Sequence, residues 1–421
     1  MNVEIVTIGD ELLLGFTIDT NGAHLARELA QRGIAVVRRA SCGDSAESIA
    51  EAVNDALERT GAVITTGGLG PTSDDLTKDS IAAIFRREMF VDEHIVDGLK
   101  QLWKSRGWPG ELPVANLQQA RIPQGATILV NRHGTAPGIW LEDERGRWVA
   151  MLPGVPREMR GMLADELLPL IERRAAGTID ASRTTIVSRA LRTTGMGESM
   201  IADTLGALAK NPEGVSLAYL PGWEGTDLRL TSRNRTAADA AIALEKAAVA
   251  LRAVLGPIIY GEDKDDLAAA VLTLLRSRKM TIAVAESCTG GLLGARITEI
   301  PGSSDVMLGG IIAYANEVKE QQLGVQKATM VAHGAVSEET VREMATGVRQ
   351  RFGTHIGVAI SGVAGPGGGS PEKPVGTVCF GLDVDGHVTS VRSSLVGDRT
   401  EIRQRAAQAA LNAIRRFVES H

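Results

Sequence analysis

The sequence has few cysteines, no long apolar run and no excess of positive charge, and each shortage excludes a class of protein. Its 421 residues include three cysteines, which lie far apart with no CxxC pair. This excludes a disulfide framework and a cysteine-based zinc site. No apolar run approaches the roughly 20 residues needed to cross a bilayer. The net charge of −6 argues against a general nucleic-acid or membrane-surface binder. The opening MNVEIVTIGDELL has no signal-peptide pattern, so we expect a cytoplasmic protein that binds no membrane.

The order of strand and helix patterns predicts three domains. Short β-branched runs alternate with amphipathic helical patterns in the first and last parts of the chain, which predicts parallel α/β sheets covered on both faces. The segment between them has the pattern of a small α+β unit. We therefore expect domains over residues 1–174, 175–256 and 262–421, with linkers near 174–182 and 256–266.

The stretch AVAESCTGG, residues 283–291, ends a predicted buried strand with three nucleophile side chains in a row. Ligands collect at the carboxyl ends of strands in open α/β sheets. The helix that begins near Gly290 offers backbone N–H groups to an oxyanion or a phosphate. The same residues also fit a plain strand-to-helix turn in which Thr289 caps the helix. Cys288 is intrinsically the best nucleophile, but no histidine accompanies it in the motifs, so Ser287 is the preferred candidate.

Two neighbouring motifs supply partners for this serine. AYANEVK contains Tyr314 and Lys319, and a lysine in a partly dehydrated site can act as base while the tyrosine orients it or relays a proton. GDRTEIR places Arg399 and Arg403 on one helix face, where they can hold a phosphate. The alternative is that Tyr314 is an ordinary aromatic side chain and that the lysine and the two arginines are solvated charges without a role in a site. Together with the glycine-rich loop at 361–378, the expected substrate-binding positions are Cys288, Thr289, Gly290, Gly291, Gly365, Gly367, Gly368, Arg399 and Arg403.

These motifs closely resemble those of the CinA C-terminal domain family, which includes the nicotinamide mononucleotide (NMN) deamidases. The resemblance rests on AESCTGGLLGARITEIPGSS, GGIIAYANEVKEQQLGV, HGAVSEETV, SGVAGPGGGSPEKPVGTV and GDRTEIR, and it covers nearly all of residues 262–421. It implies hydrolysis of the NMN carboxamide to nicotinic acid mononucleotide and ammonia, without a cofactor. It also implies that Ser287 is the nucleophile, with Tyr314 and Lys319 as its partners.

The N-terminal domain combines carboxylates with glycines just after its predicted strands, in GDELLLGFTIDTN, TTGGLGPTSDDLTKD and LPGVPREM. Glycines let the backbone approach a phosphate, and carboxylates can hold a divalent cation, although turns and helix caps use the same residues. The spacing matches neither a Walker loop nor a Rossmann fingerprint, which disfavours an ordinary ATPase or dehydrogenase. The expected metal ligands are Asp10, Glu11, Asp74 and Asp75. The expected substrate-binding positions are Thr66, Gly67, Gly68, Gly70, Pro153 and Gly154.

This combination resembles the molybdopterin-binding-like domain at the front of CinA proteins, over about residues 1–172. An aspartate of cofactor-biosynthesis relatives falls on Asp75, and a second acidic position, also expected to bind substrate, falls on or near Asp44. Leu69 replaces the usual threonine, a departure typical of the CinA branch. The resemblance implies splitting of ADP-ribose into AMP and ribose 5-phosphate with Mg²⁺, Mn²⁺ or Co²⁺. The alternatives are a nucleotide- or pterin-binding module without activity and, for the whole chain, a non-enzymatic competence or DNA-damage adaptor.

The middle segment resembles a KH-type module. GWEG at 222–225 fits the GxxG loop with which such modules bind single-stranded nucleic acid. The loop lies between two predicted strands rather than two helices and contains Glu224, and residues 175–256 hold nine Lys/Arg against eight Asp/Glu. This is not a basic footprint, so we expect no nucleic-acid binding and interpret the segment as a spacer or dimerisation element. Resemblance to the family predicts a homodimer.

Overall fold

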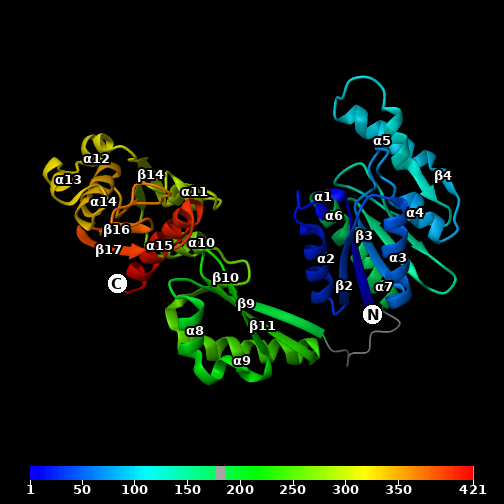
Figure 1. Ribbon diagram of the computed structural model, residues 1–421, viewed down its shortest axis with the longest axis horizontal. Coiled ribbons are helices and arrows are strands. Elements are labelled where there is room, and N and C mark those ends of the chain that lie inside the picture. The colour runs from blue at the N-terminus through cyan, green and yellow to red at the C-terminus, as the bar shows by residue number, and fades with distance from the viewer. Residues whose placement is uncertain (176–184, 421) are drawn as a thin grey trace. The chain divides into compact units, whose positions relative to one another are not determined.

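The computed structural model describes residues 1–175 and 185–420. The chain forms two compact units, one of Met1–Val187 with Arg233–Ala241, the other of Ser188–Ser232 with Ile242–His421. The described residues form three large sheets and one two-stranded ribbon (Figure 1). In these residues, no helix is both long enough and apolar enough for a membrane span.

The N-terminal domain is built on a six-stranded sheet in the order β2-β1-β3-β8-β7-β6. The first four strands are parallel, and β7 and β6 continue the sheet in antiparallel pairs. Every residue of β3 and β8 is buried, as expected for central strands covered on both faces. The strands of this sheet are β1 (Asn2–Ile8), β2 (Ala35–Cys42), β3 (Ala62–Thr66), β6 (Thr127–Leu129), β7 (Gly138–Glu142) and β8 (Trp148–Leu152).

Helices cover both faces of this sheet and create two apolar cores. Side chains alternate along a strand, so Ile64 of β3 faces the core under α2 and α6, and Val63 faces the core under α3 and α4. The helices are α1 (Asp10–Leu13), α2 (Thr20–Gln31), α3 (Ala46–Thr60), α4 (Thr77–Ile84), α5 (Glu93–Ser105), the 3₁₀ helix η1 (Val114–Ala120), α6 (Pro156–Met162), the π-helical turn η2 (Leu163–Leu167) and α7 (Leu168–Ala175). The small ribbon pairs β4 (Met89–Val91) with β5 (Arg121–Pro123).

The middle domain has a four-stranded sheet in the order β10-β11-β9-β12. Its strands are β9 (Thr185–Thr193), β10 (Ser216–Pro221), β11 (Thr226–Arg235) and β12 (Ile259–Glu262). Its helical segments are α8 (Glu198–Leu205), η3 (Gly206–Ala209), η4 (Pro212–Gly214), α9 (Ala237–Leu255) and η5 (Gly256–Ile258).

The expectation of a linker over 256–266, and of a middle domain that ends at 256, is wrong. Ile259, Gly261 and Glu262 of β12 pair antiparallel with β9 and complete the middle sheet. A four-residue strand in a charged connection shows no clear strand pattern, and its pairing partner lies about 70 residues earlier in the chain. The other expected linker, near 174–182, lies mostly outside the described residues.

The C-terminal domain has a five-stranded sheet in the order β14-β13-β15-β16-β17. Strands β14, β13 and β15 are parallel, and β16 and β17 form an antiparallel hairpin against β15. The strands are β13 (Ile282–Glu286), β14 (Met307–Ile312), β15 (Ile356–Gly362), β16 (Thr377–Val384) and β17 (His387–Ser394). The sheet thus confirms the α/β fold expected for this part of the chain.

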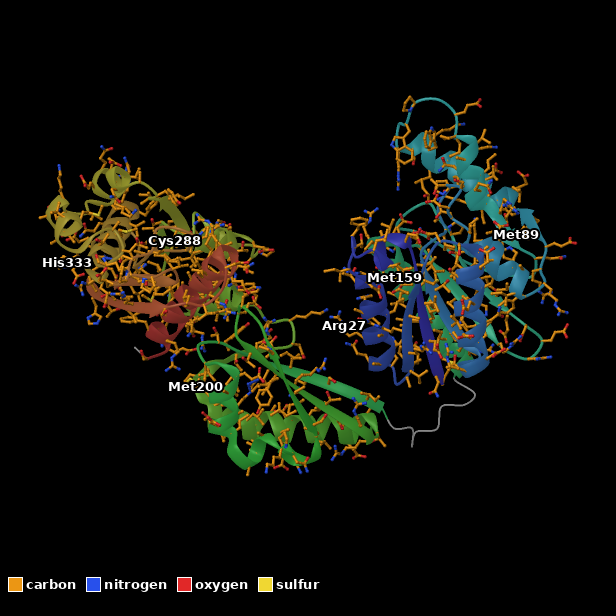
Figure 2. All side chains as sticks on the ribbon, viewed as in Figure 1. Arg27, Met89, Met159, Met200, Cys288 and His333 are labelled. Carbon is orange, nitrogen blue, oxygen red and sulfur yellow. The ribbon has the colours of Figure 1, made fainter. Side chains whose placement is uncertain are left out.

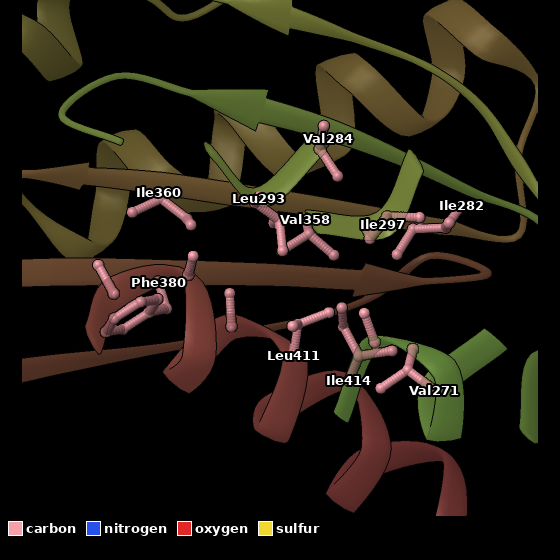
Figure 3. Packing of buried hydrophobic residues seen from close by; sticks show 14 of the residues in the cluster. Val271, Ile282, Val284, Leu293, Ile297, Val358, Ile360, Phe380, Leu411 and Ile414 are labelled. Atoms are coloured by element: carbon pink, nitrogen blue, oxygen red, sulfur yellow. The ribbon is translucent and has the colours of Figure 1, made fainter. Parts of the chain in front are cut away.

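Two helical layers enclose this sheet. Ile282 and Val284 of β13 pack into the core beneath α10, α11 and α15 (Figure 3), whereas Ala283 and Ala285 face the core beneath α12 and α14. The helices are α10 (Leu267–Ser277), α11 (Leu292–Thr298), η6 (Ser303–Asp305), α12 (Asn316–Leu323), α13 (Lys327–His333), α14 (Glu338–Phe352) and α15 (Arg399–Ser420). The alternation along β13 positions the site at its carboxyl end.

Candidate functional site

Two adjacent residues at the end of β13 send their side chains to opposite faces of the C-terminal sheet. Ile282 and Val284 face the layer of α11, and because side chains alternate along a strand, Glu286 continues this series. Its carboxylate contacts the N-terminus of α11, whereas Ser287 contacts a side chain of α12. The strand therefore supplies a carboxylate to one layer and a hydroxyl to the other.

Ser287 and Lys319 are in contact in a buried site. The Ser287 N–H donates to the carbonyl of Ile360 on β15 over 2.9 Å, which fixes the backbone of the turn. The Nζ atom of Lys319, on α12, lies 3.1 Å from Oγ of Ser287. Ser287 is 8% exposed and Lys319 is 1% exposed. The structure thus brings together two of the three residues predicted to be catalytic.

The surroundings of Lys319 shift its protonation equilibrium toward the neutral amine. Burial lowers the pKa of Lys319, and this outweighs the opposing effect of nearby acidic groups. Nζ also donates to the backbone carbonyls of Ala313 over 2.7 Å and of Tyr314 over 3.1 Å. A neutral amine has two N–H groups and one lone pair. If the two carbonyls take the two N–H groups, the lone pair is left for the hydroxyl proton of Ser287.

Glu286 holds the turn that carries Ser287, a role that reasoning from the sequence missed. Its carboxylate is 1% exposed and accepts from the backbone N–H groups of Gly291 and Leu293 at 3.0 Å and of Gly294 at 2.8 Å. Such a carboxylate satisfies N–H groups that a helix N-terminus leaves unpaired and interacts favourably with the helix dipole. The alternation along the strand is the signal that could have found it.

Two expectations about this turn are wrong. Thr289 does not cap α11, because Gly291 occupies the N-cap position with φ of 95°, and the buried Thr289 hydroxyl has no partner among the described residues. The N–H groups of Gly290 and Gly291 are not free for an oxyanion. Gly290 donates to the carbonyl of Ser287 over 3.1 Å, and Gly291 donates to Glu286. These N–H groups fix the turn instead of receiving a ligand.

The two predicted arginines connect the turn, the tyrosine and the glycine-rich loop. Arg399 donates to the carbonyl of Gly365 over 2.7 Å and lies 3.5 Å from the hydroxyl of Tyr314. Arg403 donates to the carbonyl of Thr289 over 2.8 Å. The side chain of Tyr314 is largely exposed, and it is the backbone carbonyl of this residue that contacts the catalytic lysine candidate. Further along the loop, and exposed, lie Gly367 and Gly368.

Cys288 is buried beside the serine, within the C-terminal domain (Figure 2). Burial is the main cause that raises the pKa of the Cys288 thiol to about 11. The thiol is therefore protonated near neutral pH, and it is the thiolate that acts as a nucleophile. This environment favours Ser287 over Cys288 as the attacking group.

In the N-terminal domain, Asp10 and Asp44 form two hydrogen bonds with each other just after the ends of β1 and β2. The Asp10 N–H donates to Oδ2 of Asp44 over 3.0 Å, and the Asp44 N–H donates to Oδ1 of Asp10 over 3.3 Å. Gly43 permits this approach, because a Cβ there would lie 2.6 Å from Oδ1 of Asp10. These bonds use one oxygen of each carboxylate, so the second oxygen of each remains for another partner.

The glycines after β3 lie where the backbone leaves no room for a side chain. A Cβ on Gly67, which has φ of 113°, would overlap the carbonyl oxygen of Ile8. A Cβ on Gly68, with φ of 64°, would overlap the hydroxyl of Thr77. Because β1 and β3 are parallel neighbours, this loop and the segment that begins with Asp10 meet at one edge of the sheet.

Of the four predicted metal ligands, Asp75 is already engaged in closing the loop. Its carboxylate accepts from the N–H groups of Gly70 over 2.7 Å and of Thr72 over 2.8 Å. Glu11 and Asp74 are exposed. The part of the chain that the structure describes contains no group of three or more His, Cys, Asp or Glu side chains placed to hold a metal ion. A metal at this edge would therefore need further ligands from its substrate or from water.

Asn21 joins the loops that follow β3 and β8. Its Nδ2 donates to the carbonyl of Gly154 over 2.7 Å and to the hydroxyl of Thr66 over 3.2 Å, and Thr66 donates to the carbonyl of Pro153 over 2.9 Å. The amide oxygen of Asn21 is buried and has no partner among the described residues. Three predicted substrate positions are thus tied together by a residue that the prediction left out of the site.

Sequence profiles of three known domains match successive parts of the chain. The probable molybdopterin binding domain matches residues 4–173, the KH domain of the damage-inducible protein CinA matches 188–261, and the CinA C-terminal domain matches 264–418. A CinA-like protein of Gemmatimonas aurantiaca is 61% identical, over 99% of this chain and 96% of its own length. The chain belongs to the CinA family. The expected molybdopterin-binding-like, KH-like and C-terminal α/β domains are confirmed.

Other proteins are similar over the full length or over part of the chain. A CinA-like protein of Kosmotoga olearia is 41% identical, over 99% of this chain and 98% of its own. The solved structure of the competence/damage inducible protein CihA from Agrobacterium tumefaciens is 39% identical, with a TM-score of 0.35, and covers 36% of this chain and 93% of its own. The KH match extends into β12, in agreement with the place of that strand in the middle sheet.

We predict that Glu286→Gln destabilises the C-terminal domain, because an uncharged amide replaces a carboxylate that accepts three N–H groups. Hydrogen bonds to charged groups are worth about 1.5–3 kcal/mol, so the free energy of unfolding should fall by about that amount. Urea unfolding followed by hydrogen exchange of peptides from this domain measures it. The control is Glu299→Gln at the exposed end of α11. Equal urea midpoints for the two variants would contradict the role of Glu286.

Proposed function

We propose that the C-terminal domain deamidates nicotinamide mononucleotide, with Ser287 as nucleophile and Lys319 as general base. The observation that carries the proposal is the 3.1 Å contact between Nζ of Lys319 and Oγ of Ser287 in a buried site. The resemblance of the C-terminal motifs to a family that includes the NMN deamidases supports the choice of substrate.

The proposed reaction passes through an acyl-enzyme. Oγ of Ser287 attacks the carboxamide carbon while its proton moves to Nζ of Lys319. The carbon–nitrogen bond then breaks, and the leaving nitrogen takes the proton from Lys319. Ammonia departs, and the acyl group remains bound to Ser287 as an ester. Water attacks the ester and gives one proton to the lysine, which returns it to the serine oxygen. Nicotinic acid mononucleotide leaves, and the enzyme recovers both groups unchanged.

Arg399 and Arg403 have donors to spare for the substrate phosphate. Each guanidinium carries five N–H groups. The contacts described above use two of them on Arg399 and one on Arg403. The remaining groups suit a phosphate, because planar guanidinium groups bind its oxygens in pairs.

We predict that Ser287→Ala lowers the kcat of ammonia release from NMN by about 10³-fold or more, because it removes the only attacking atom. A coupled assay of ammonia with the full chain measures the rate. The matched control is Cys288→Ala, which removes the rival nucleophile beside it and should keep kcat within about tenfold of wild type. The assignment of Ser287 as nucleophile is wrong if Ser287→Ala stays active, or if Cys288→Ala is inactive while Ser287→Ala is not.

The pH dependence of kcat/KM should report Lys319. Protonated lysine cannot accept the serine proton, so the rate should rise about tenfold per pH unit below the pKa of Lys319 and level off above it. Because burial lowers the pKa of Lys319, the midpoint should lie below 10.5, the value of an unperturbed lysine. Circular dichroism over the same range controls for unfolding. A midpoint at or above 10.5 would remove Lys319 as the base.

For the N-terminal domain we propose hydrolysis of ADP-ribose to AMP and ribose 5-phosphate with a divalent metal ion. The supporting observation is the Asp10–Asp44 pair, placed at the strand ends beside the glycine loop. Mg²⁺ is commonly bound by one or two carboxylates together with substrate phosphates, and each aspartate retains an oxygen for this purpose. When bound, the metal would neutralise charge on the diphosphate.

Asp10→Asn should lower AMP formation from ADP-ribose at least about tenfold in Mg²⁺, Mn²⁺ or Co²⁺, because it removes one of the two available carboxylate charges. Chromatographic detection of AMP measures it. The same variant should keep the rate of NMN deamidation, and Ser287→Ala should keep the rate of AMP formation. If the wild-type protein forms no AMP with any of the three metals, the proposed hydrolysis is wrong and the domain is a binding module without this activity.

A further inference from the structure

The GWEG loop, residues 222–225 between β10 and β11, packs against the C-terminal domain. Gly225 has φ of 154°, and a Cβ there would overlap the carbonyl of Thr193 at the end of β9. The N–H of Gly222 closes the loop by donating to the carbonyl of Gly225 over 2.8 Å. The loop is therefore held in one conformation, with Trp223 and Glu224 at its tip.

Arg296 of α11 receives the tip of this loop. Its Nη2 lies 3.4 Å from Oε1 of Glu224 and 3.2 Å from Oδ2 of Asp266. Its guanidinium lies 5.1 Å from the ring centre of Trp223, a favourable cation–π distance. Gln408 of α15 accepts from Nη1 of Arg296 and donates to the backbone carbonyl of Glu224 over 3.0 Å. Side chains and backbone of both domains are thus paired across the contact.

The charges at this contact have specific partners. Arg296 is 9% exposed and Gln408 is 2% exposed, so an unpaired charge here would be costly. Glu224 is shared between Arg296 and Arg192, and Arg192 also pairs with Asp227 over 2.9 Å. A partly buried network of this kind favours a single arrangement of its members.

The contact acts on the helix that follows the proposed nucleophile. Helix α11 has seven residues, so Arg296 lies only about one turn from the N–H groups that Glu286 binds at the helix start. The backbone that joins Glu286 to those N–H groups is the turn containing Ser287. A shift of α11 at its Arg296 end would therefore move this turn.

We propose that the GWEG loop is a docking element for α11, and that the middle domain positions the Ser287 turn through Glu224 and Arg296. The loop is engaged within the chain, and its carboxylate would repel phosphates, so it does not act as a nucleic-acid clamp. Glu224 is a positioning residue and does not touch the substrate. The effect on catalysis rests on the proposed deamidation, whereas the docking does not.

The test compares Glu224→Ala, the conservative Glu224→Asp and the control Asp203→Ala in the full chain. Asp203 is an exposed acid of α8 in the same domain. Hydrogen exchange of residues 287–298 should be faster in Glu224→Ala than in wild type, and normal in Asp203→Ala. The kcat for NMN should fall roughly 2- to 30-fold with KM nearly unchanged, and Glu224→Asp should restore part of it.

The outcomes separate the two parts of the proposal. Unchanged exchange in Glu224→Ala overturns the docking, whether or not NMN is a substrate. Faster exchange with an unchanged kcat overturns the positioning of Ser287. Binding of a fluorescent single-stranded oligothymidylate that Glu224→Ala abolishes overturns the proposal as well, because a docked loop cannot hold a strand. Wild-type protein that releases no ammonia from NMN refutes the deamidase while the exchange data still decide the docking.

Discussion

The three hydrogen bonds of the Glu286 carboxylate are the constraint on which the C-terminal site depends. They join the last residue of β13 to the first turn of α11, and the backbone between these points has little freedom left. Ser287 lies in that backbone and is fixed on its other side by the carbonyl of β15. The backbone that carries the hydroxyl is thus fixed on both sides, and Oγ lies 3.1 Å from Nζ of Lys319.

The burial of Lys319 follows from the same geometry. Ser287 falls on the face of α12 because Glu286 occupies the other face, and α12 places the lysine where solvent is excluded. A fully charged ammonium in such a place would be expensive unless surrounded by acceptors. Two backbone carbonyls compensate for this cost in part and hold the side chain in position, while burial still lowers the pKa of Lys319. The position of the Lys319 side chain and its lowered pKa thus have one structural cause, the burial of this side chain.

Much of this arrangement is predictable from the sequence, and the rest depends on contacts that no local pattern contains. The strand at 282–286 and the arginines on one helix face follow from periodicity. The cap of α11 does not, because a threonine at a turn has a local preference for capping, and here a carboxylate from the neighbouring strand displaces it. Strand β12 was missed for a similar reason, since four residues acquire strand structure only by pairing with β9.

The middle domain shows how one side chain changes what a loop can do. A GxxG loop binds a nucleic-acid backbone by bringing its own backbone close to phosphates, which requires small residues and no negative charge. GWEG keeps both glycines and hence the tight turn, but Glu224 reverses the local electrostatics and Trp223 adds a surface for a cation. A loop with these properties favours guanidinium groups, and it binds Arg296 of α11 as well as Arg192 of its own domain. The same backbone geometry that would bind a nucleic-acid strand therefore binds a helix of the neighbouring domain.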